Sequence, residues 1–133
     1  MKSKAVLSQT EVQHILAAAR AEAQNNQWAV SIAIVDDGGH PLALERLDGC
    51  APISAYIATE KARTSALGRR ESKGYEEMVN GGRQAFLSAP LLTSLEGGVP
   101  IIFDGQVIGA IGVSGVTSVQ DAQVAKVGAQ SLN

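Results

Sequence analysis

Two apolar runs separated by Asp104-Gly105 dominate the C-terminal third of the chain. They span residues 99–103 and 106–113, and Asp-Gly between two such runs is typical of a two-residue β-hairpin turn. Gly109 and Gly112 interrupt the second run, and glycine inside a strand marks a bulge or the close approach of another group. The segment therefore predicts an antiparallel strand pair on which other elements pack closely.

The remaining patterns predict helices alternating with short strands. A capping box, Ser8-Gln9-Thr10-Glu11, opens an amphipathic segment that ends near Asn25-Asn26. Further helices are expected over 52–67, 73–80 and 118 to about 131, the last with Asp121 in a second capping box; strands are expected over 28–35, 42–48 and 91–95, and a loop over 83–90. The order α-β-β-α-α-β-β-β-α predicts an α+β fold with a mostly antiparallel sheet, in a single domain over residues 1–133.

The second expected strand carries polar and apolar residues on the same face. Its alternation places Leu42, Leu44, Arg46 and Asp48 on one side. Two charged residues thus share a face with two leucines, which indicates a polar site at the edge of an apolar surface.

Composition and charge exclude several classes of protein. Eleven basic and thirteen acidic side chains give a net charge of -2, without the clustered basic excess of a nucleic-acid-binding protein. The lone Cys50 can form no intrachain disulfide. No apolar run approaches the ~20 residues of a membrane helix, so a cytoplasmic protein without membrane or nucleic-acid partners is expected.

The residues themselves point to a small anionic ligand but to no reaction. Neither His14 nor His40 has the companions of a metal-site motif, so no metal site is predicted. The loop from Ser114 and Gly115 leads into a helix start, where amides and the helix dipole favour a carboxylate. Cationic side chains that suit the same anion are Arg46, Lys61, Arg63 and Arg83. The alternative for Lys61 is that its aliphatic stem lies along apolar surface while its ammonium group stays in water.

Several blocks of the chain resemble the GlcG/HbpS-type heme-binding family. They are Val30 to Asp36, Gly39 through Gly49, Lys61-Ala-Arg-Thr64, Gly97 to Ile102, Asp104-Gly105, Gly109 to Gly115 and Asp121. The resemblance extends from about Ser8 to Leu132. The chain also resembles the C-terminal part of PduO-type proteins, whose adenosyltransferase activity belongs to another domain and is not carried over.

The resemblance implies a five-stranded antiparallel sheet flanked by helices, profilin-like or PAS-like in layout. It also implies assembly into dimers, tetramers or octamers, and heme or another tetrapyrrole as a ligand. Heme iron needs an axial ligand; the candidates are His14, His40, Cys50, Tyr56, Tyr75 and Met78. The segment 69–77 lacks the Pro-Thr pair expected after the second helix, which leaves room for a different ligand.

Three hypotheses follow. The first is a homo-oligomeric tetrapyrrole-binding protein, accessory to a catabolic pathway, in which Arg46, Lys61 and Arg83 hold carboxylates. The Ser114-Gly115 amides would assist, and Asp48 or Asp121 would orient the cations. The alternative is an enzyme (an isomerase, decarboxylase or hydrolase) acting on a small carboxylated catabolite of an aromatic or glycolate pathway. Asp48, His40 or Asp121 would then be the general acid or base. The third is a structural subunit whose oligomer interface is its function.

Overall fold

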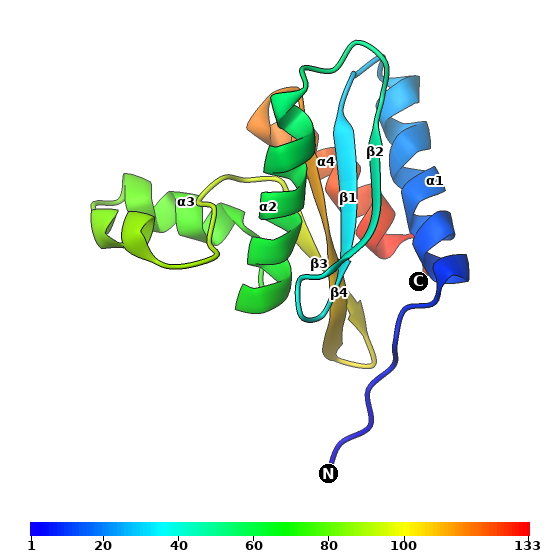
Figure 1. The fold of residues 1–133 in the computed structure, drawn as a ribbon, viewed down its shortest axis with the longest axis horizontal. Helices are drawn as coiled ribbons and strands as arrows, with labels where there is room; N and C mark the ends of the chain where they lie inside the picture. Colours follow the sequence, from blue (N-terminus) through cyan, green and yellow to red (C-terminus); the bar gives the residue numbers. More distant parts are fainter.

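The structure is a computed structural model that describes residues 1–133. Its elements are α1 (Gln9–Asn25), β1 (Ser31–Asp36), β2 (Pro41–Arg46), α2 (Ile53–Gly68), α3 (Lys73–Asn80), the short 3-10 helix η1 (Gln84–Ser88), β3 (Gly98–Phe103), β4 (Gln106–Ser114) and α4 (Ser118–Gln130) (Figure 1). None of these helices combines the length and the apolar character that crossing a membrane requires.

The strands form one antiparallel sheet in the order β2-β1-β4-β3, so β2 and β3 are its edges. Alternation along β1 sends Ile32 and Ile34 into a core shared with α1 and α4, and Ala33 and Val35 toward α2. Helices therefore cover both faces, with α2 in front of the sheet and α4 behind it in the view of Figure 1.

Close contact between α2 and the sheet depends on small residues. Ala58, Ala62 and Ala66 are fully buried on α2, and a Cβ at Gly112 of β4 would lie only 2.5 Å from the Ala62 nitrogen. A Cβ at Gly109 would lie 2.5 Å from the Val35 carbonyl oxygen. The expected close approach at both glycines is confirmed.

The prediction of a fifth strand over 91–95 is wrong, because the sheet has four strands. Leu91 has a φ of 57°, in the left-handed region, which ends an extended run. The Thr93 amide donates to Thr64 Oγ1 at 2.8 Å, and the Leu95 amide donates to the Thr93 carbonyl at 2.9 Å. These amides bond to α2 and to their own turn, so no ladder forms. The observed order is α-β-β-α-α-η-β-β-α, since η1 replaces part of the expected loop.

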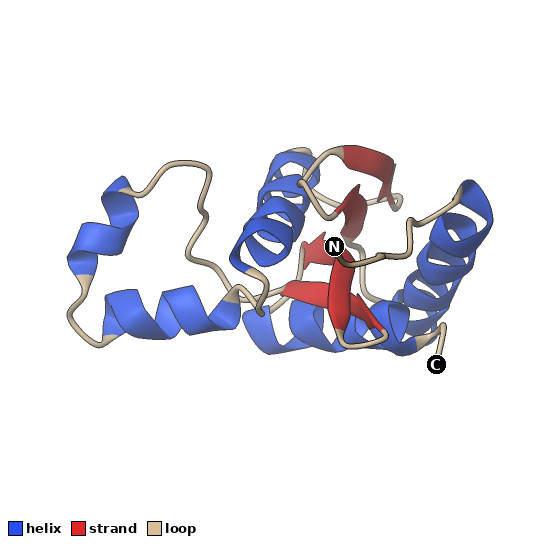
Figure 2. Cartoon of the chain, turned by 90° about the horizontal axis from the view of Figure 1, so that it is seen from below, coloured by secondary structure: helices blue, strands red, loops and turns tan.

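Residues 71–95 form an arm that carries α3 and η1 away from the sheet (Figure 2). Neither α3 nor η1 contains a buried residue. The arm is held internally by the Tyr75 and Phe86 rings, whose centroids are 5.8 Å apart. The Arg70 guanidinium lies 4.5 Å from the centroid of the Tyr75 ring, beside the start of the arm. The arm is thus organised, yet largely uncovered by its own chain.

Candidate functional site

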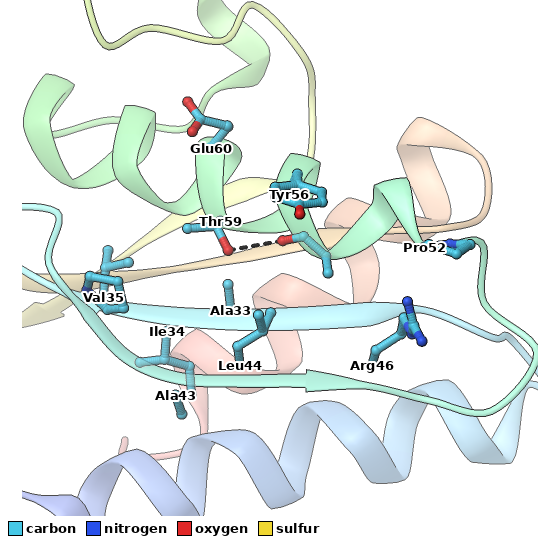
Figure 3. A pocket seen from close by; sticks show the side chains of 12 residues that line it. Ala33, Ile34, Val35, Ala43, Leu44, Arg46, Pro52, Tyr56, Thr59 and Glu60 are labelled. Atoms are coloured by element: carbon cyan, nitrogen blue, oxygen red, sulfur yellow. Dashed lines mark hydrogen bonds between the residues drawn. The ribbon is translucent and has the colours of Figure 1, made fainter.

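The largest hollow is a groove of about 550 Å³ between the edge strand β2 and helix α2, with β1 as its floor. Cavities that hold small molecules or cofactors measure ~300–1,000 Å³. We call it the β2–α2 groove; Figure 3 shows its lining, Ala33, Ile34, Val35, Pro41, Ala43, Leu44, Arg46, Pro52, Ala55, Tyr56, Thr59 and Glu60. Most of this lining is apolar, which suits a ligand with an apolar body.

The groove follows from the position of β2 at the sheet edge. Helix α2 packs mainly over β4 and β1, which leaves β2 partly uncovered. Leu44 pairs with Ala33 and Arg46 pairs with Ser31, so both residues face α2, as their alternation predicts. The prediction fails for Leu42, which packs on the α1/α4 core next to a bulge in the ladder. Asp48 lies beyond the end of β2.

The charged groups of the groove differ in whether they are already paired. Arg46 forms no ion pair within 4.0 Å, although it is exposed at one end of the groove. Glu60, at the other end, is paired with Arg63 one turn further along α2. Thr59 Oγ1 donates to the Ala55 carbonyl oxygen at 2.9 Å, so its hydrogen is already used. Arg46 is therefore the one unpaired charge in the lining.

Lys61 of α2 and Asp121 of α4 lie elsewhere, where they meet beside the end of β4. Their Nζ and Oδ2 atoms are 3.1 Å apart, and the side chains are only 5% and 4% exposed. Lys61 Nζ also donates to the Val113 carbonyl oxygen at 2.9 Å. Burial raises the pKa of Asp121, an effect that the nearby Lys61 ammonium opposes. Each charge is satisfied by the other, and neither reaches the groove.

The Ser114-Gly115 loop is also committed within the chain. The Val116 amide donates to Asp121 Oδ1 at 3.1 Å, so the predicted anion site holds the protein's own carboxylate. Asp121 does not serve in a capping box, because Thr117 caps α4 with Gln120 as its partner. Ser114 is buried, and its carbonyl oxygen lies 3.8 Å from the Cys50 sulfur.

The other predicted residues are dispersed. His40 stands in the β1–β2 turn with Nδ1 3.0 Å from Asp36 Oδ1, whereas Asp48 follows β2. The six-residue strand β2 stands between them and spans roughly 17 Å at ~3.3 Å per residue. Arg83 belongs to the arm, with Cζ 4.8 Å from the centroid of the Phe86 ring. The structure therefore does not bring His40, Asp48 and Asp121 together.

Sequence patterns did not predict the wall of the groove that α2 forms. Tyr56 and Glu60 line the groove at i and i+4 beside the alanine stripe of α2, and Ile53 shares their helix face without lining the groove. Ile53 is 64% exposed and Tyr56 is 77% exposed, which is high for large apolar side chains. The sequence signal that could have indicated this wall is the presence of two bulky side chains, Ile53 and Tyr56, beside a stripe of alanines that suits close packing.

Comparison with known proteins places this geometry in a family. A family model described as "Haem degrading protein HbpS-like" matches residues 7–130. Protein GlcG of Escherichia coli (strain K12) is 69% identical over 114 residues, covering 86% of this chain and 85% of that protein. The crystal structure of HbpS has 27% identity and a TM-score of 0.90, covering 100% of this chain and 94% of that chain.

A second solved structure contains a ligand. The PduOC:heme complex is 26% identical with a TM-score of 0.87, covering 97% of this chain and 96% of that chain. Sequence and fold thus agree over nearly the whole length, and the earlier resemblance is confirmed. The chain belongs to this HbpS-like family.

Proposed function

We propose that this protein binds heme or a closely related tetrapyrrole in the β2–α2 groove. The observation that carries the proposal is an apolar groove of about 550 Å³ with a single unpaired cation, Arg46, at one end. A ligand with an apolar ring and carboxylates on its edge matches both features. The heme in the related PduOC structure supports the choice of ring.

The residues of the groove fit such a ligand. Leu44, Pro52 and Ala55 offer apolar surface to a flat ring, and burial of that surface favours binding by ~25 cal/mol per Å². The Arg46 guanidinium can bind a propionate through two parallel hydrogen bonds. Bound heme would supply a redox-active iron whose properties depend on its axial ligand. Tyr56 is the one residue of the lining with a side chain of the iron-ligating types His, Cys, Met and Tyr.

The other predicted ligand-binding residues receive different proposed roles. We assign Lys61, Asp121 and the Ser114-Gly115 loop to the internal junction of α2, β4 and α4, because their polar groups already bind one another. Arg83 stands on the arm, where its guanidinium lies over the Phe86 ring and outside the lining of the groove. Arg46 is therefore the cation that we propose for the ligand carboxylate.

We also propose that copies of this chain assemble through the arm. Helix α3 has eight residues and none is buried, whereas isolated helices below ~12–15 residues are marginal in water. Leu87 and Leu91 are 69% and 59% exposed. Packing against another copy would cover these residues and stabilise the short helix. The number of copies, two, four or eight, remains the expectation drawn from the family resemblance.

The enzyme hypothesis has less support. A general acid or base must lie within hydrogen-bonding reach of the reacting group, and Asp121 is buried against Lys61. His40 and Asp48 stand at opposite ends of β2. No single hollow therefore collects the three candidates, and we favour binding over acid–base catalysis on a small catabolite.

A hemin titration followed by absorbance tests the proposed site. Wild-type protein is expected to show a saturable Soret shift. Arg46→Ala should weaken binding by about ten- to a hundredfold, since a hydrogen bond to a charged group is worth ~1.5–3 kcal/mol. Arg83→Ala is the matched control and should leave the titration unchanged. A featureless wild-type titration would refute heme binding, and a loss in Arg83→Ala alone would move the site to the arm.

Tyr56→Phe separates iron ligation from ring binding. The variant removes the phenol oxygen and keeps the ring, so hemin should still bind while its spectrum changes. An unchanged spectrum would show that Tyr56 does not ligate the iron. Metal-free protoporphyrin should bind wild type and variant alike, because it has no iron to ligate.

A further inference from the structure

We infer that the β2–α2 groove selects tetrapyrroles whose carboxylates lie on one edge over those whose carboxylates surround the ring. The inference rests on the proposed function, because it concerns the same groove. It depends on the contrast between the two ends of the groove, Arg46 at one and Glu60 at the other (Figure 3).

The two charged residues are separated along the length of the groove. Arg46 and Pro52 lie at the end where β2 finishes and α2 begins, whereas Glu60 stands two turns along α2, above Thr59 in the view of Figure 3. Eight residues of helix separate Pro52 from Glu60, a rise of about 12 Å at ~1.5 Å per residue. A flat macrocycle lying along the groove would place one edge at each end.

At the Glu60 end the neighbouring cation, Arg63, is already paired and does not line the groove. Arg63 Nη2 donates to Glu60 Oε2, and the side chains of Arg63 and Glu60 are 28% and 37% exposed. The Arg63 stem packs against Gly39, where an added Cβ would lie 2.8 Å from Arg63 Cγ. Glu60 borders the groove and Arg63 does not. A ligand at this end therefore meets a carboxylate whose partner is not part of the lining.

Arg63 Nε has no hydrogen-bond partner but is buried, so the groups that line this end offer no exposed donor to a second acid. The Thr59 hydroxyl already donates to the Ala55 carbonyl oxygen, and Val35 and Pro41 offer apolar surface. A ligand carboxylate here would lose water without gaining a hydrogen bond, and it would face the charge of Glu60. Repulsion of an unwanted partner is an established route to specificity.

The chemistry of porphyrins supplies a direct comparison. Protoporphyrin IX carries its two propionates on one edge, whereas coproporphyrin III carries one on each of its four pyrroles. Neither ring contains iron, so the comparison does not involve an axial ligand. With one acidic edge at Arg46, protoporphyrin presents an apolar edge to Glu60, whereas coproporphyrin presents carboxylates.

Fluorescence titrations of the full-length protein with both porphyrins test the inference. Wild type should bind protoporphyrin IX at least about tenfold more tightly than coproporphyrin III, since like charges placed together cost binding energy. Glu60→Gln should bring the two affinities within about threefold by strengthening coproporphyrin binding, because the variant removes the carboxylate and frees Arg63. Glu77→Gln, the same change at an exposed position of the arm, should leave the ratio unchanged.

Ionic strength provides a second measurement that needs no variant. Raising the salt concentration shortens the reach of exposed charges, so the preference of wild type for protoporphyrin should narrow. Equal binding of both porphyrins by wild type, or a ratio that neither Glu60→Gln nor salt alters, would overturn the inference while leaving heme binding intact. Failure of wild type to bind either porphyrin or hemin would overturn the inference and the proposed function together.

Discussion

Lys61 and Asp121 form an ion pair of 3.1 Å in which neither side chain is more than 5% exposed. The pair joins α2 to α4, and the Lys61 ammonium also bonds the Val113 carbonyl oxygen of β4 at 2.9 Å. The two charged groups thus connect three elements, α2, β4 and α4. Sequence analysis proposed Lys61 as a ligand-binding cation and Asp121 as a residue that orients the cations or acts as general acid or base. Their burial and mutual contacts indicate instead that they join α2, β4 and α4.

Asp121→Asn is expected to destabilise the protein by about 3–5 kcal/mol, because the variant leaves the Lys61 charge buried without its partner. The measurement is urea unfolding followed by circular dichroism. Glu71→Gln is the control, since Glu71 pairs with Lys126 at 3.7 Å on the surface, where a pair is worth ~0–1 kcal/mol. A loss below about 1 kcal/mol in Asp121→Asn would contradict the structural role.

Acid sensitivity should depend on the pair of Arg20 and Glu45, which links α1 to β2. The Arg20 guanidinium, whose Nη2 donates to Glu45 Oε2 at 2.7 Å, holds the pKa of the Glu45 carboxyl below its ordinary value of 4.5. A carboxyl whose pKa is lower in the folded than in the unfolded state stabilises the protein at pH values above its unfolded-state pKa. This stabilisation is lost as the pH falls through its folded-state pKa. The side chains are 34% and 31% exposed, so the contribution is below about 1 kcal/mol.

Glu45→Gln should therefore flatten the dependence of stability on pH between about 5 and 3, and slightly lower stability at pH 7. Urea midpoints measured across this range test the expectation. Glu22→Gln is a suitable control, because Glu22 bonds the Gln123 amide and no cation. Parallel curves for wild type and Glu45→Gln would show that the pair contributes nothing.

Local patterns predicted most of the fold because they depend on neighbours in the chain. The helix over 73–80 and the hairpin around Asp104-Gly105 occur as expected, and alternation placed Leu44 and Arg46 on the face that lines the groove. The fifth strand failed for a tertiary reason: the Thr93 amide bonds to Thr64 on α2. No local pattern records that contact.

The same distinction between local patterns and tertiary contacts explains which parts of the candidate site were predicted. Arg46 was identified from its own strand, but the pairing of Lys61 with Asp121 joins residues 60 positions apart. Judged from the sequence, both charges are free to bind a ligand or substrate, whereas in the fold they bind each other. Tyr56 became part of a groove only because β2 is a sheet edge that α2 leaves partly uncovered. Which charges remain unpaired is a property of the assembled domain.

Gly112→Ala should strongly destabilise the protein, because the new methyl group would lie 2.5 Å from the Ala62 nitrogen and force α2 off the sheet. Overpacking of a core costs ~1–3 kcal/mol and occasionally more, and backbone cannot rotate away as a side chain can. Gly105→Ala is the control: its φ of 71° disfavours alanine, but nothing lies within 4 Å of the added atom. Thermal melts of the two variants should differ, with Gly112→Ala the less stable; equal melting temperatures would contradict close packing at Gly112.

The arm should govern assembly. Leu87→Glu places a charge on a leucine that is 69% exposed in one chain, and burying that charge at an interface between copies would be costly. The variant should therefore shift the protein toward the 13.8 kDa monomer, as measured by sedimentation velocity. Val119→Glu is the matched control, also 69% exposed, and an acidic residue suits the first turn of α4. A monomeric wild type would exclude assembly, and a shift in Val119→Glu without one in Leu87→Glu would place the interface on α4 rather than on the arm.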